Sequence, residues 1–153
     1  MQLQCPVLLA GDEVPTRYTC DGENVSPPLK WTDPPNGTRT FALIVEDPDA
    51  PSSVFTHWLV YDIPAERQEL PEGVDGHPEL PDGGTQGQND FGETGFGGPC
   101  PPTGMHRYVF RLFALDQTLE MAPGAKKADL LQLMEGHILE TAEVIGTYAR
   151  QGE

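Results

Sequence analysis

The chain has 153 residues, 37% of them hydrophobic, and this length suits one domain built around one core. Its formal net charge of −15 argues against a nucleic-acid-binding surface, which needs Lys and Arg, and against electrostatic docking on anionic lipid. No apolar run approaches the roughly 20 residues of a membrane span, and the N-terminus lacks a basic, cleavable leader pattern. We therefore expect a cytoplasmic protein without stable membrane insertion. The acidity fits a salt-rich cytoplasm and an ordinary acidic protein equally well.

The first half of the chain alternates short strand patterns with turns. We predict strands at residues 3–9 and 14–19, followed by a proline-stiffened loop that begins at Cys20. Residues 40–46 are apolar on both faces, which is typical of a central buried strand. That strand runs into residues 47–51, Asp-Pro-Asp-Ala-Pro, where two carboxylates flank a proline.

Two further strands are predicted, at residues 54–63 and 105–115. In the first, alternation places His57 on the same face as Leu59, Tyr61 and Ile63. In the second, His106 and Tyr108 share one face, whereas Arg107 points to the other and is expected to pair with a loop acid. Residues 64–83 are polar, acidic and rich in proline, so we expect a surface excursion with little regular structure.

Helical patterns are confined to the last third of the chain. Residues 126–135 offer an apolar side, and in residues 137–150 Ile138, Ala142, Ile145 and Ala149 recur near i, i+4, i+7 and i+11. We predict a helix for each segment. Strands first and helices last, together with 17 glycines and 16 prolines, indicate a mainly β, antiparallel domain with C-terminal helices.

A long loop, residues 84–104, feeds directly into the strand that carries His106 and Tyr108. Long loops in compact domains are usually functional or disordered. This one contains Phe91 and Phe96 and ends in a rigid Pro-Cys-Pro-Pro run at residues 99–102. We therefore expect an ordered functional loop.

Four blocks of the sequence, in order, resemble the phosphatidylethanolamine-binding protein family, in the bacterial and archaeal branch that includes the Raf-kinase-inhibitor-like proteins. They are DPDAP at 47–51, HWLVYDIP at 57–64, GQNDFGETGFGGPCPPTGMHRYVFRLFALD at 87–116 and HILETAEVIGTYAR at 137–150. The resemblance spans nearly the whole chain. It implies a single domain over residues 1–153, folded as two antiparallel sheets in a Greek-key-like sandwich with helices at one end.

The resemblance also implies a shallow pocket for a small anion or a phosphoryl headgroup. The expected ligand-binding residues are Asp47, Asp49, Pro51, His57, Gly98, Pro99, Pro101, Pro102, His106 and Tyr108. It further implies a cis Ala50–Pro51 peptide bond, a possible homodimer and a role in regulating kinases or proteases as in relatives. A Cys20–Cys100 disulfide is the pairing that it favours, with free buried thiols as the alternative.

The chemistry of this residue set suits an anion, because imidazoles, a phenol and backbone N–H groups are donors. The carboxylates would orient the histidines or accept from a ligand ammonium group, so phosphoethanolamine fits. We expect no cofactor and no enzymatic activity. Two alternatives stay open: a hydrolase- or lyase-type enzyme using the Asp/His pocket, and a zinc site made by Asp47, Asp49, His57 and His106. Taken singly, these residues also have ordinary structural explanations as core histidines and turn-capping aspartates.

Overall fold

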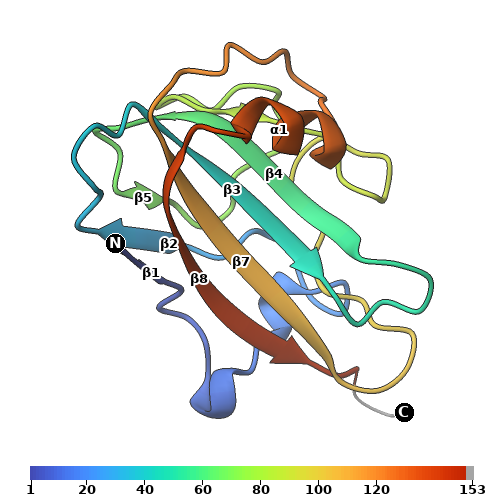
Figure 1. Cartoon of the computed structure of the whole chain (residues 1–153). Helices are drawn as coiled ribbons and strands as arrows, with labels where there is room; N and C mark the ends of the chain where they lie inside the picture. The colour runs from blue at the N-terminus through green and yellow to red at the C-terminus, as the bar shows by residue number, and fades with distance from the viewer. Residues whose placement is uncertain (151–153) are drawn as a thin grey trace.

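The computed structural model describes residues 1–150 and is mainly β, with two antiparallel sheets and one α-helix over these residues (Figure 1). The smaller sheet contains, in spatial order, β1 (Gln2–Gln4), β2 (Leu29–Thr32) and β5 (Glu69–Leu70). The larger sheet contains β6 (Thr85–Gln86), β4 (Phe55–Pro64), β3 (Thr40–Asp47), β7 (His106–Leu115) and β8 (Ile138–Tyr148). The helix α1 spans Lys127–Met134. The antiparallel β fold predicted from the sequence is confirmed.

The molecule has three layers. The main core fills the space between the two sheets, where Leu29 and Trp31 of β2 meet Phe41 of β3 and Phe110 of β7. A second core lies on the other face of the larger sheet, where α1 covers β3, β4 and β7. Alternation along β7 explains both cores, because Phe110 and its even-numbered neighbours face the first and Phe113 faces the second.

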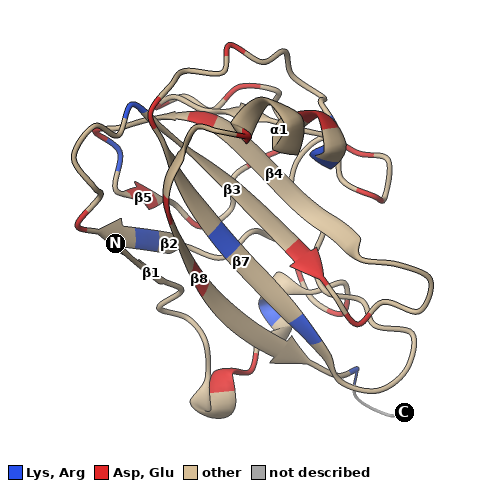
Figure 2. Cartoon of the chain, in the orientation of Figure 1, with Lys and Arg blue, Asp and Glu red and all other residues tan. Residues whose placement is uncertain are grey.

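Ion pairs extend over the part of the outer sheet face that α1 leaves open. The guanidinium of Arg111 on β7 lies between Glu46 of β3, at 3.0 Å, and Glu143 of β8, at 3.2 Å. Lys127, at the start of α1, reaches the same Glu46 carboxylate at 2.6 Å. Figure 2 shows that acidic residues otherwise gather in the loops and at the ends of elements. This network ties the helix to the sheet and interleaves charges of both signs.

The predicted second helix is wrong, because residues 138–148 form β8. The strand pairs with β7 from His106↔Tyr148 to Leu115↔Ile138. One edge of β7 is already paired with β3, so its other edge would otherwise expose unpaired backbone groups along a buried strand. Tertiary pairing therefore overrides the helical spacing. His137 does not begin a helix either, and its Nδ1 lies 2.9 Å from Asp116 Oδ1.

Three other sequence predictions also need correction. The N-terminal strand stops at Gln4, just before Pro6, which lacks the N–H that a ladder requires, and Thr16–Tyr18 forms a 3-10 turn rather than a strand. The Ala50–Pro51 peptide bond is trans, so the predicted cis bond is wrong.

By contrast, Cys20 and Cys100 form the disulfide that the resemblance favours, and Cys5 is a buried free thiol. No helix in the described part of the chain is long and apolar enough to cross a membrane.

A β-bulge in β4 decides which way His57 faces. Val45 of β3 pairs with Trp58 and Glu46 pairs with Thr56, so His57 is the extra residue. A bulge turns the side chain of its extra residue out of simple alternation. His57 accordingly leaves the face of Leu59 and Tyr61, which pack under α1, and contacts Tyr108 on the opposite face. The predicted alternation for this strand is therefore wrong at His57, and also at Ile63, which a second register shift places in the core between the sheets.

Candidate functional site

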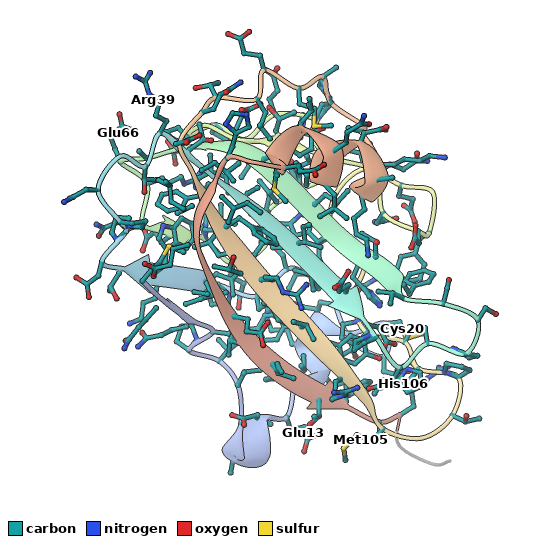
Figure 3. The ribbon with its side chains drawn as sticks, viewed as in Figure 1. Glu13, Cys20, Arg39, Glu66, Met105 and His106 are labelled. Carbon is teal, nitrogen blue, oxygen red and sulfur yellow. A yellow bond between two sulfur atoms is a disulfide. The ribbon has the colours of Figure 1, made fainter. Side chains whose placement is uncertain are left out.

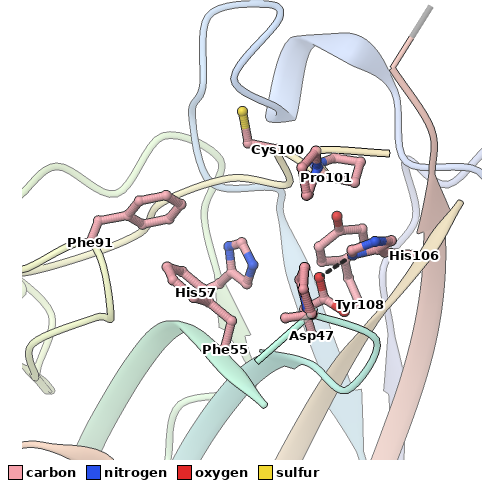
Figure 4. A pocket seen from close by; sticks show the side chains of 11 residues that line it. Asp47, Phe55, His57, Phe91, Cys100, Pro101, His106 and Tyr108 are labelled. Atoms are coloured by element: carbon pink, nitrogen blue, oxygen red, sulfur yellow. Dashed lines mark hydrogen bonds and ion pairs between the residues drawn. The ribbon is translucent and has the colours of Figure 1, made fainter. Parts of the chain in front are cut away.

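A cavity of about 220 Å³ opens where β3 ends and β7 begins. Because β3 and β7 are antiparallel neighbours, the last residue of one lies beside the first residues of the other. Figure 3 places Cys20 and His106 together at this end of the molecule. The cavity is lined by Asp47, Ala50, Pro51, Phe55, His57, Phe91, Cys100, Pro101, Pro102, His106 and Tyr108 (Figure 4).

Asp47 and His106 form a buried pair on one side of the cavity. His106 Nδ1 lies 2.6 Å from Asp47 Oδ2, and the backbone N–H of Asp49 donates to Asp47 Oδ1 at 2.7 Å. Both carboxylate oxygens are therefore engaged within the protein. This contact assigns the Nδ1 proton to the Asp47 side and leaves Nε2 of His106 for other partners.

His57 is held in place by the loop of residues 84–104. Its Nδ1 donates to the carbonyl oxygen of Gly97 at 2.6 Å, and the Gly97 N–H donates back to the His57 carbonyl at 3.0 Å. Burial lowers the pKa of His57 below the usual 6.5, although Gly97 and Asp47 oppose this effect. The imidazole is therefore neutral near pH 7, with an Nε2 that accepts hydrogen bonds.

Tyr108 presents a buried hydroxyl without a hydrogen-bond partner among the described residues. Burial raises the pKa of Tyr108, and the negative charges of Asp47 and Asp49 raise it further. The phenol is therefore protonated at every physiological pH. A buried polar group without a partner is uncommon, since each one loses its hydrogen bonds to water without replacement.

Three predicted site residues lie outside the cavity lining. The carboxylate of Asp49 is bound by Arg107, which donates from its backbone N–H, Nε and Nη2 at 2.8–2.9 Å. These bonds lower the pKa of Asp49 to about 2. The loop acid expected to pair with Arg107 is thus Asp49. Gly98 and Pro99 instead anchor the lining residues 100–102 to the N-terminal loop. The Gly98 N–H donates to Asn24 Oδ1 at 2.8 Å, and the Pro99 carbonyl accepts from the Cys20 N–H at 3.1 Å.

Sequence reasoning missed Ala50, Phe55 and Phe91 as lining residues, whereas Cys100 lies in the Pro-Cys-Pro-Pro run that was expected to form the cavity wall. Phe55 and Phe91 stand with their ring centroids 4.8 Å apart, and Phe91 is 46% exposed. An aromatic residue in a long, otherwise small and polar loop is the signal by which Phe91 could have been found. Within residues 1–150 no group of three or more His, Cys, Asp and Glu side chains is placed to hold a metal ion.

Two packed β-sheets with a cavity at one end, where Asp47, His57, His106 and Tyr108 meet, form the arrangement of a ligand-binding protein. A sequence model of the phosphatidylethanolamine-binding protein family matches residues 5–149. The chain therefore belongs to that family.

Relatives and solved structures agree with this assignment. The UPF0098 protein of Methanothermobacter thermautotrophicus is 55% identical over 137 residues, which are 90% of this chain and 91% of the relative. The UPF0098 protein of Aquifex aeolicus is 51% identical over 92% of this chain and 83% of its own length. The crystal structure of CT736, a phosphatidylethanolamine-binding protein homologue from Chlamydia trachomatis, has a TM-score of 0.89 and 39% identity, covering 98% of this chain and 97% of that one. Escherichia coli YbcL, described as a new member of the mammalian family, has a TM-score of 0.89 and 36% identity, covering 98% of both chains.

Proposed function

We propose that the chain binds a small oxyanion or phosphoryl group in the cavity between β3, β4 and β7. The unpartnered hydroxyl of Tyr108 carries this proposal. A buried donor left without an acceptor destabilises the protein, and an oxyanion in the cavity would supply that acceptor. The hydroxyl always carries its proton in the physiological range, so it suits an anion better than it suits a cation.

The two imidazoles complement the phenol. His106 is fixed through Nδ1 by Asp47, and His57 is fixed through Nδ1 by Gly97, so both have Nε2 available for a ligand. A protonated phosphate oxygen donates to neutral His57, whereas a fully ionised oxyanion requires an imidazolium donor. The cavity of about 220 Å³ is smaller than the roughly 300 Å³ at which sites for drug-sized ligands begin, so it suits a headgroup and not a lipid tail.

The test is calorimetric titration of sulfate into the wild-type protein and His106→Ala. In its imidazolium form His106 donates from Nε2 as well, so removing the ring deletes a donor and should weaken sulfate binding at acidic pH by about 1–3 kcal/mol, the scale of a hydrogen bond to a charged group. His77→Ala is the matched control, because His77 is exposed and its Nδ1 also contacts an aspartate, Asp75. Equal sulfate affinity in wild type and His106→Ala would contradict the proposal.

The pH dependence follows from His57. Its lowered pKa means that the imidazolium donor forms only as the pH falls below the ordinary value near 6.5. Sulfate keeps its charge throughout this range, so any change in its affinity with pH arises from protonation of groups in the protein. We expect tighter sulfate binding at about pH 5.5 than at about pH 8, measured by the same titration. Affinity that is flat or rises with pH would count against the imidazoles as donors.

A further inference from the structure

The cavity has two chemically different halves. Phe55 and Phe91 form one side, each close to His57, with ring centroids 5.0 and 5.5 Å from the imidazole. The row of rings continues from His57 to Tyr108 at 5.3 Å and on to His106 at 6.5 Å. Figure 4 shows Phe55 and Phe91 on one side of His57, and Tyr108 and His106 on the other. The two phenylalanines therefore lie at the opposite end of the cavity from His106, across His57 and Tyr108.

The aromatic half is preformed. Phe91 packs directly onto Gly97, where an added Cβ would lie 2.4 Å from the ring. The Gly97 carbonyl in turn holds His57, so the loop fixes the ring and the imidazole together. Phe91 is nevertheless 46% exposed, which leaves an aromatic surface at the cavity. Rings of this kind add affinity for another ring through offset or edge-to-face contacts.

Asp47 is the one carboxylate in the cavity lining, and its side chain is buried. Both oxygens of Asp47 already accept hydrogen bonds, from His106 and from the Asp49 backbone. The Asp49 carboxylate lies outside the lining and is bound by Arg107. The rest of the wall is apolar, from Ala50, Pro51, Pro101 and Pro102. An ammonium group placed against this apolar wall would lose water, and the buried carboxylate that it could approach is already shared with His106 and the Asp49 backbone.

We propose that the site selects small phosphoryl compounds whose substituent is a single apolar aromatic ring, in preference to phosphoethanolamine. This inference rests on the proposed function, because the phosphoryl group occupies the Tyr108 end. The substituent then lies against Phe55 and Phe91. The small volume limits it to about the size of one ring. Phe91 is the residue that determines specificity.

The experiment compares the affinities of phenyl phosphate, butyl phosphate, phosphoethanolamine and inorganic phosphate by competition or calorimetry. We expect wild type to bind phenyl phosphate about three- to tenfold more tightly than inorganic phosphate, the range that one aromatic contact supplies. Butyl phosphate should fall between the two, and phosphoethanolamine should bind no more tightly than phosphate. In Phe91→Ala the ratio of phenyl phosphate to phosphate affinity should fall to about one. Phe91→Tyr keeps an aromatic ring and should keep the wild-type ratio.

Leu133→Ala is the control, since Leu133 is 45% exposed on α1, and it should keep the wild-type ratio. Phosphoethanolamine binding as tightly as phenyl phosphate would overturn the inference while leaving oxyanion binding intact. A ratio unchanged in Phe91→Ala, or butyl phosphate binding as tightly as phenyl phosphate, would overturn it as well. If no phosphate compound binds at any pH, the proposed function fails and this inference fails with it.

Discussion

Two buried tyrosines differ in what their hydroxyls meet. Tyr61 donates to the Ala122 carbonyl at 2.6 Å and accepts from the Ala125 N–H at 3.3 Å, so it ties the loop before α1 to β4. Tyr108 lies at the cavity, and its hydroxyl has no partner among residues 1–150. Burying a polar group without a partner lowers stability, whereas a satisfied group contributes modestly. The hydroxyl of Tyr61 therefore contributes to the stability of the fold, whereas that of Tyr108 costs stability and is available to a ligand.

We predict that Tyr108→Phe leaves the free energy of unfolding unchanged or raises it by about 1 kcal/mol, because no hydrogen bond is lost. The same substitution should weaken oxyanion binding by about tenfold, since the donor is gone. Tyr61→Phe is the matched comparison and should destabilise the protein by about 1 kcal/mol, because the Ala122 carbonyl loses its donor. Urea unfolding with and without sulfate measures both effects. A Tyr108→Phe protein destabilised as much as Tyr61→Phe would show that the hydroxyl has a structural partner.

At this scale the sequence predicted side-chain direction well where strands are regular. The shared face of His106 and Tyr108 follows from alternation and is confirmed by their place in one cavity. His57 fails the same reasoning, because a one-residue bulge carries no compositional signal in β4 and reverses the direction of the side chain. The direction of Arg107 was predicted correctly, and the structure supplies its partner, Asp49.

Among the elements, β8 shows why local spacing can mislead. Its inward positions include Ala142, opposite Leu112 on β7, and Gly146, which is small where residues 8–14 approach the strand closely. Its outward positions include Ile138 and Ile145, which are 44% and 36% exposed. Small residues inside and large ones outside weaken the two-residue period and leave an apparent helical stripe. Only the need of β7 for a second neighbour resolves the ambiguity, and that need is a property of the assembled sheet.

We predict that Gly146→Val destabilises the protein by about 1–3 kcal/mol, as over-packing does. A Cβ at this position would lie 2.7 Å from Val14 Cγ2 and 3.1 Å from Leu8 Cδ2, where the N-terminal segment crosses the strand. Thr141→Val on the exposed part of the same strand is the control and should change stability by less than about 0.5 kcal/mol. Thermal unfolding of both variants tests this. If Gly146→Val is as stable as Thr141→Val, the close crossing of residues 8–14 over β8 is wrong.

For the whole molecule, the sequence alone predicted the central strands of the larger sheet but not which residues meet at the cavity. Central strands at 40–46, 54–63 and 105–115 follow from their apolar patterns and match β3, β4 and β7. The gathering of Asp47, His57 and His106 in one cavity came from the family resemblance, because no periodicity relates a loop acid to histidines ten and 59 residues further on. The aromatic half was missed for the same reason: Phe55 and Phe91 belong to separate segments that meet only after folding.

The Cys20–Cys100 disulfide joins the N-terminal loop to the cavity wall, with 80 residues between its ends. On one side Cys100 lines the cavity, and on the other Asp21 accepts hydrogen bonds from Tyr148 and Arg150 near the end of the described chain. The disulfide and the Asp21 hydrogen bonds therefore connect the cavity wall to the loop at residues 20–21 and to the end of β8. The disulfide weighs against the cytoplasmic location expected from the sequence, since disulfides are rare in the cytosol outside hyperthermophiles.

We predict that reduction destabilises the wild-type protein by about 4.5 kcal/mol, the chain-entropy value for a loop of this length, within the range of about 2–5 kcal/mol seen for native disulfides. Oxyanion affinity should fall in parallel, because the wall residues Cys100 and Pro101 lose their anchor to Cys20. The measurement is urea unfolding and sulfate titration of wild type and the Cys20→Ser/Cys100→Ser variant, each with and without a reductant. The variant should match reduced wild type and should not respond to reductant, which controls for effects on Cys5. Oxidised and reduced wild type with the same stability and the same sulfate affinity would show that the disulfide supports neither the fold nor the cavity.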